Sequence, residues 1–190
     1  MNIKELVRKN RSYRRFFESE SISLETLREL VDLARLSASG ANMQPLKYIL
    51  SCDPEKNALI FPTLAWAGYL KDWPGPVEGE RPSAYIIILG DKRIRQSFGV
   101  DPGIAAQSIL LGATEKGFGG CIIASIKKEV LAEALKIPEE LEILLALALG
   151  KPKERVVIDP LGPDGDIKYW READGTHHVP KRPLDEIIIG

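Results

Sequence analysis

The chain has 190 residues, enough for a substantial apolar core, and we expect one domain that spans residues 1–190. Its 26 lysines and arginines nearly balance its 27 aspartates and glutamates, which gives a formal net charge of −1. This balance argues against the broad basic field with which proteins gather nucleic acid, so any bound anion must be held locally.

The cysteines and the longest apolar run indicate the setting of the protein. Cys52 and Cys121 lie far apart in apolar runs, which favours buried reduced thiols over a disulfide framework or a metal site. The longest apolar run, residues 143–149, is too short to cross a bilayer. We therefore expect a cytoplasmic protein with no membrane partner and no metal.

The first chemical motif follows a short amphipathic helix predicted over residues 2–9. Three arginines surround Ser12 at positions 11, 14 and 15. Guanidinium groups form forked hydrogen bonds to phosphate oxygens, and a serine hydroxyl adds one more, so this segment could wrap a phosphate. On this segment alone, a solvated basic turn that pairs with Glu18 and Glu20 is the favoured interpretation.

A second amphipathic helix is predicted over residues 23–36, with Ser23 as its N-cap. It ends in a run of small and amide residues at 37–45. The side chains of Asn42 and Gln44 both donate and accept hydrogen bonds, which suits the edge of a heterocycle. A plain connector between a helix and a strand is the alternative.

Two strands are predicted next, beginning near Tyr48 and over residues 84–89. Three consecutive isoleucines in the second indicate a strand that is buried on both faces. Between the strands, Pro54 and Pro62 each begin a short predicted helix. The helix from Pro62 carries Trp66 and precedes a proline-rich loop, so this region could cover a ligand or form a subunit contact.

The longest apolar helix is predicted to begin at Asp101, which acts as its N-cap, and to end at Gly117. It is apolar on most sides, as is typical of the central helix of a domain or of half of a subunit interface. A buried strand is predicted over residues 118–123, entered through two glycines. Glycine there permits close approach of another backbone, although tight packing is the commoner cause.

The remaining chain is predicted to form a helix over residues 127–135, a strand over 143–149 and a hairpin around Asp174-Gly175. The hairpin carries His177 and His178, which point to opposite faces of a strand and cannot chelate one metal; a hairpin surface is expected for them. Lys181 and Arg182 then form a second group of cations before a short helix. If both groups bind one phosphate, the two ends of the chain must meet in space.

Three stretches, in this order, resemble the FMN-dependent nitroreductase family: Arg-Ser-Tyr-Arg-Arg-Phe at 11–16, Ser-Gly-Ala-Asn-Met-Gln-Pro at 39–45, and residues 101–111 running into Gly117-Phe118-Gly119. The resemblance implies an α+β fold with a central mixed or antiparallel sheet flanked by helices. It also implies a homodimer formed through long central helices, with FMN bound at the subunit interface.

The resemblance also assigns roles to residues. Arg11 and Ser12 would hold the FMN phosphate together with the second cation group, and Arg14 would stabilise charge at the ring. No side chain would be catalytic, because the chemistry belongs to the cofactor. The residues implied in cofactor binding are Arg11, Ser12, Tyr13, Arg14, Ser39, Asn42, Gln44, Ile123, Ala124, Ser125, Lys181 and Arg182, with the group at 39–44 at least partly from the other subunit.

The activity implied is a ping-pong oxidoreduction. NAD(P)H would reduce tightly bound FMN by hydride transfer, and a small electron-poor acceptor such as a nitroaromatic or a quinone would then be reduced in its place. Two alternatives stay open at this stage. One is a family member with a specific non-nitro substrate, of the dehalogenase or flavin-fragmenting type; the other is a flavin-binding scaffold with little turnover.

Overall fold

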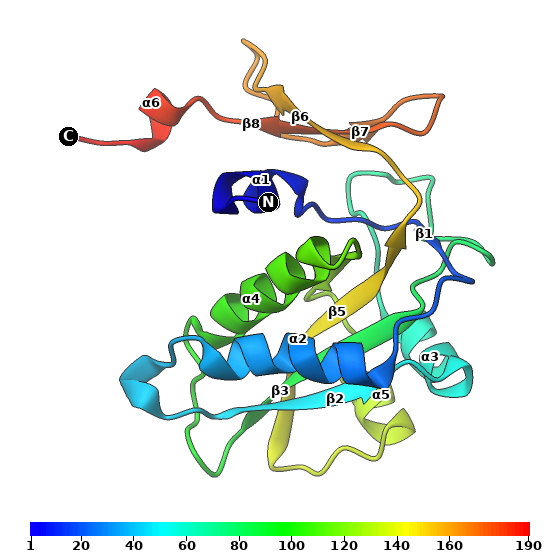
Figure 1. The fold of residues 1–190 in the computed structure, drawn as a ribbon, viewed down its shortest axis with the longest axis vertical. Helices are drawn as coiled ribbons and strands as arrows, with labels where there is room; N and C mark the ends of the chain where they lie inside the picture. Colours follow the sequence, from blue (N-terminus) through cyan, green and yellow to red (C-terminus); the bar gives the residue numbers. More distant parts are fainter.

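The run of isoleucines forms β3 (Ala84–Asp91) at the middle of the main sheet in the computed structural model, which describes residues 1–190. All eight residues of β3 are buried, as predicted for a strand covered on both faces. β3 lies between β2 and β5, and β4 and β1 also pair with β5, with every pair antiparallel (Figure 1). The other strands of this sheet are β1 (Phe16–Phe17), β2 (Leu46–Ser51), β4 (Gly119–Ile123) and β5 (Leu141–Pro152).

Helices cover both faces of the main sheet. Side chains alternate between the two faces along β3, and both sets are apolar and need to be buried. Ile86 and Ile88 point to one face, where they pack against α2 (Leu24–Leu36) and α4 (Asp101–Glu115). Ile87 and Leu89 point to the other, against Ile60 of α3 and Leu131 of α5. The helices of that second face are α3 (Pro54–Ile60) and α5 (Lys128–Ala134), and α3 leads into the short 3-10 helix η2 (Phe61–Thr63).

The central helix α4 is covered on most of its surface within the protomer. Gly112 allows α2 to pack closely, since a Cβ atom at this position would overlap the Leu33 side chain. On the opposite side, Gly103 and Gln107 are exposed. A helix that is apolar over most of its surface therefore leaves one stripe uncovered.

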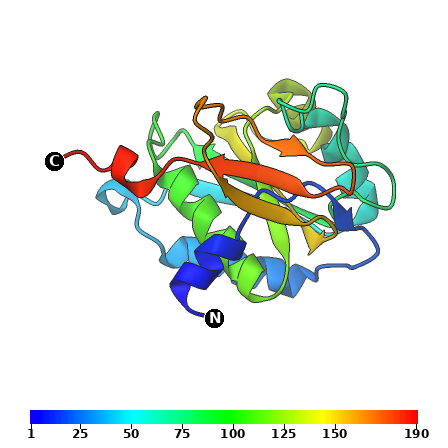
Figure 2. The ribbon, with the colours of Figure 1, turned by 90° about the horizontal axis from the view of Figure 1, so that it is seen from above.

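A second, smaller sheet lies beyond α1 (Ile3–Lys9) from the main sheet, and it crosses the molecule when seen from above (Figures 1 and 2). Its strands are β6 (Val156–Pro160), β7 (Trp170–Arg171) and β8 (His177–Lys181), followed by α6 (Leu184–Ile187). β7 and β8 form the predicted hairpin, whereas β6, which runs parallel to β8, was not predicted. The two ends of the chain thus lie on the same side of the main sheet.

Three local predictions were wrong. Asp101 is not the N-cap of α4, because its carboxylate accepts hydrogen bonds from Ser39 Oγ (2.6 Å) and Gly40 N (2.9 Å) instead. The segment after Pro62 forms only η2, since Ala65 N donates to Ser125 O (3.0 Å) and holds the chain extended. His177 is fully buried rather than lying on a hairpin surface.

Both cysteines are free; Cys121 is buried as predicted, whereas Cys52 is only partly buried. None of the helices combines the length and the apolar character needed to cross a membrane.

Candidate functional site

The N-terminal arginine segment lies along the edge of β4. Ser12 forms an isolated bridge with Gly120, and Tyr13 N donates to Gly120 O (3.0 Å). A Cβ atom at Gly120 would lie 2.7 Å from Ala148 O, and one at Gly119 would lie 2.5 Å from the Tyr13 ring. The two glycines that begin β4 are therefore required for close packing, part of it against the arginine segment.

The buried carboxylate of Glu154 joins the two ends of the chain. It accepts hydrogen bonds from the backbone N–H groups of Arg14 and Arg15 and from Arg171 Nη2 at 2.9 Å. The side chain of Glu154 has no exposed surface, and that of Arg171 is 14% exposed. Because a buried carboxylate requires such partners, Glu154 fixes the arginine segment against the hairpin of the small sheet.

A cavity of about 290 Å³ opens where these segments meet. Arg11, Ser12 and Arg14 line it from the N-terminal side, and Lys181 lines it from β8. The N-terminal cation group and Lys181 of the second group, almost a whole chain apart in sequence, therefore converge on one cavity. Its other lining residues include His177, Tyr169, and Gln107 and Leu110 of α4.

The charges in this cavity lack the partners that other cations of the protein have. Arg11, Arg14 and Lys181 form no ion pair with a carboxylate, whereas Arg15 makes two 2.6 Å hydrogen bonds to Glu80. Burial lowers the pKa of Arg11, and its Nε atom is buried without a hydrogen-bond partner. A cavity lined by three uncompensated cations favours an anion with more than one negative charge.

A second cavity, of about 210 Å³, adjoins the first. Arg14, Ile122 and Tyr169 line both cavities. The remaining walls are Cys121 and residues 123–125 of the β4 segment, and residues 65–68, which the hydrogen bond from Ala65 to Ser125 holds beside them. The region predicted as a possible cover thus does form one side of a cavity.

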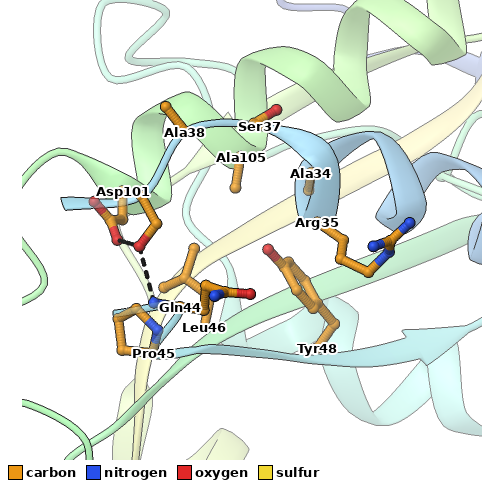
Figure 3. A pocket seen from close by; sticks show the side chains of 11 residues that line it. Ala34, Arg35, Ser37, Ala38, Gln44, Pro45, Leu46, Tyr48, Asp101 and Ala105 are labelled. Atoms are coloured by element: carbon orange, nitrogen blue, oxygen red, sulfur yellow. Dashed lines mark hydrogen bonds between the residues drawn. The ribbon is translucent and has the colours of Figure 1, made fainter. Parts of the chain in front are cut away.

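The third group of predicted site residues, at 39–44, lies away from these two cavities in the protomer. Ser39 and Gln44 line a separate pocket of about 170 Å³ between α2, α4 and β2, into which Gln44 and Tyr48 point (Figure 3). Burial and the nearby Asp101 raise the pKa of Tyr48 to about 12. Burial alone would raise the pKa of Asp101, but its hydrogen bonds from Ser39 and Gly40 outweigh that effect and lower the pKa. This pocket touches α4 at Asp101 and Ala105, whereas the cation cavity touches it at Gln107 and Leu110, which lie on a different face of the helix.

Three predicted residues lie outside these cavities. The Tyr13 hydroxyl donates to Lys9 O (3.0 Å), Arg182 pairs with Glu186 on the surface, and Asn42 belongs to the 3-10 helix η1 (Gly40–Asn42) without lining the neighbouring pocket. Tyr169, His177 and Glu154 were not predicted. Only the expectation that the two ends of the chain meet could have indicated these residues, because each of them contacts residues far away in sequence.

Comparisons with known proteins were made for the whole chain. The model of the nitroreductase family matches residues 7–151. A Cr(VI) reductase of Pseudomonas sp. (strain G-1) is 28% identical over 190 aligned residues, covering 90% of this chain and 74% of that protein.

Solved structures give the same result for the fold. A nitroreductase family protein of Clostridium difficile 630 is 21% identical, with a TM-score of 0.70 and coverage of 100% of this chain and 98% of its own. The NADPH:FMN oxidoreductase of Vibrio harveyi, solved in complex with NAD+, is 22% identical over 85% of this chain and 74% of its own, with a TM-score of 0.66. The predicted α+β fold, with an antiparallel main sheet flanked by helices, is confirmed.

Proposed function

Because the chain belongs to the nitroreductase family and is an NAD(P)H-dependent flavin oxidoreductase, we propose that it binds FMN tightly across the two adjoining cavities and reduces nitroaromatics, quinones or similar electron-poor acceptors. The observation that carries this proposal is the convergence of three cations without carboxylate partners on one cavity. A phosphate monoester carries about −1.5 to −2 charges at pH 7, which matches such a site.

The residues present fit the cofactor. Arg11, Ser12 and Lys181 would hold the phosphate in the larger cavity, where the buried Nε of Arg11 lacks a partner. The ring would lie in the adjoining cavity against the backbone of residues 123–125, and residues 65–68 would face it from the other side. Arg14 stands on the wall that both cavities share, so its charge would reach the ring as well as the phosphate side.

The chain contributes binding and charge. When bound, FMN supplies hydride acceptance from NAD(P)H and hydride donation to the acceptor. Arg14 would stabilise the negative charge that develops on the ring, because a fixed cation costs no reorganisation during the reaction. Water can supply the protons, so no side chain is assigned as an acid.

We assign the group at 39–44 to the cofactor site of a second subunit, in a cytoplasmic homodimer. Within one protomer, Ser39 and Gln44 line a pocket on a different face of α4 from the cation cavity. The exposed stripe of α4 at Gly103 and Gln107 is the surface on which a two-fold partner would pack. Asn42, which is exposed in the protomer, would then be available to the partner's ring or ribityl chain.

The test compares two neighbouring cations. Lys181→Ala is expected to weaken FMN binding about tenfold and to reduce its salt dependence, because this side chain lines the cavity. Arg182→Ala is the matched control, since Arg182 pairs with Glu186 at the surface and should leave affinity unchanged. Affinity is measured by fluorescence titration of the apoprotein with FMN at two salt concentrations.

Two results would contradict the proposal. Equal losses in the two variants would mean that the phosphate does not lie between Arg11 and Lys181. Wild-type protein that cannot be reconstituted with FMN, or whose yellow colour does not bleach anaerobically with NADH or NADPH, would refute the activity itself.

A further inference from the structure

We propose that His177 is a positioning residue for Arg14: as a neutral imidazole it accepts a hydrogen bond from the guanidinium and holds it between the two cavities without cancelling its charge. This inference rests on the proposed function, because it concerns the cation assigned to the flavin ring. His177 belongs to β8, near the opposite end of the chain from Arg14.

The geometry fixes the protonation state of the pair. His177 Nε2 lies 3.4 Å from Arg14 Nη1, and the His177 residue is 1% exposed. A guanidinium group has donors only, so Nε2 must be the acceptor and carry no proton. The ring proton is therefore on Nδ1, which is buried and has no hydrogen-bond partner.

The other contacts of the Arg14 side chain are also neutral. Nη1 donates to Ser12 O (3.2 Å), and the guanidinium lies over the Tyr169 ring, 5.0 Å from its centroid. The Tyr169 ring lies 5.1 Å from the His177 ring, so the three side chains form one cluster. Structural arginines of the same protein are held differently, since Arg15 and Arg171 each bind a carboxylate.

This difference has an electrostatic consequence. A carboxylate beside Arg14 would orient it equally well but would neutralise the charge that faces the ring. With no partner, the long side chain would regain rotational freedom and turn toward water. A neutral acceptor avoids both outcomes.

The surroundings of His177 keep it neutral. Burial, followed by the charges of Arg14, Arg171 and His178, lowers the pKa of His177 to about 4. These charged groups face the His177 ring from the arginine segment, from β7 and from β8, and the Tyr169 phenol faces it from the loop before β7. His177 therefore remains an acceptor throughout the neutral range and cannot serve as a proton donor there.

Three substitutions separate orientation from charge. His177→Gln keeps an acceptor, His177→Leu removes it, and His177→Glu adds a negative charge beside Arg14. We expect the preference for reduced over oxidised FMN to be unchanged in the first variant. It should fall about tenfold in the second, which lowers the midpoint potential of the bound flavin by about 30 mV, and further in the third.

The midpoint potential is measured on the full-length holoproteins, with Arg14→Ala as the reference background. In that background His177→Leu should cause no further shift, because the two residues would act through one interaction. Equal potentials in the wild type and all three variants would overturn the inference, and so would a shift by His177→Leu that persists without Arg14. If His177→Leu does not fold, the midpoint potentials of His177→Gln and His177→Glu are compared instead, and equal values would overturn the inference.

A second measurement does not need the cofactor. Imidazole ¹⁵N NMR of the apoprotein should show the Nδ1–H tautomer of His177 at pH 7 and a mixture of tautomers in Arg14→Ala. An Nε2–H tautomer in the wild type would overturn the inference even if FMN does not bind. The proposed function and this inference can fail separately. If the wild-type protein binds FMN and is reduced by NAD(P)H, but the His177 variants have unchanged midpoint potentials, this inference is refuted and the proposed function stands.

Discussion

The two sheets of this protein are stabilised by different kinds of interaction. The main sheet is stabilised by apolar burial on both faces, with β3 buried along its whole length. In the small sheet, Ile158 and Trp170 are more than two-fifths exposed, and its link to the arginine segment depends on Glu154 and His177. The cation cavity lies at the seam, so the stability of the fold and the geometry of the site should respond to different substitutions.

The largest effect on stability is expected in the main sheet. Ile87→Ala removes a fully buried side chain between β3 and the helices α3 and α5. We expect a loss of about 3–4 kcal/mol in the free energy of unfolding, measured by urea denaturation, because a cavity would remain. FMN affinity should be unchanged under conditions where the variant is folded; a selective loss of affinity would show that the two regions are not separable.

A smaller loss is expected at the seam. Glu154→Gln leaves Arg171 without its carboxylate partner, at a cost of about 2–3 kcal/mol. The loss should be local: hydrogen exchange of β8 amides should accelerate, and FMN affinity should fall, before the main sheet is affected. Glu186→Gln is the control, since it breaks only the exposed pair with Arg182. If β8 and β3 lose protection equally, the small sheet is not an independent unit.

The smallest effect is a dependence of stability on pH at the same seam. The unfolded chain binds a proton at His177 below about pH 6.5, whereas the folded chain does so only near pH 4. Stability should therefore fall as the pH decreases through this window, by at most about 1.4 kcal/mol per pH unit. His177→Gln should abolish this contribution in urea denaturation at pH 7 and pH 5.5, and an unchanged slope would contradict the buried neutral state.

The same contrast explains what the sequence could predict. Periodicity and apolar runs located α2, α4 and β3, and Ser23 is the N-cap of α2 as predicted, because local patterns and apolar burial agree there. Spacing and residue type singled out both cation groups. Asp101 was misjudged because its carboxylate has a competing partner across space, and the helix after Pro62 because a hydrogen bond to Ser125 outweighs local preference.

The parts of the site that were missed share one property. Glu154, Tyr169 and His177 bear on the arginine segment through contacts that span more than a hundred residues. Neither composition nor periodicity carries such information, because the side chains are ordinary for a strand or a loop. The assignment of the group at 39–44 depends on a second chain, which no local pattern specifies.

The closure of the cation cavity by β8 has a consequence for biosynthesis. A ribosome releases the arginine segment early, yet Lys181, which completes the cavity, is made about 170 residues after Arg11. A product terminated after β5 would retain every strand of the main sheet and still lack the wall of the cation cavity that β8 supplies. Proteolytic removal of β8 would have the same outcome, so we expect retention of FMN to require β8 as well as the main sheet.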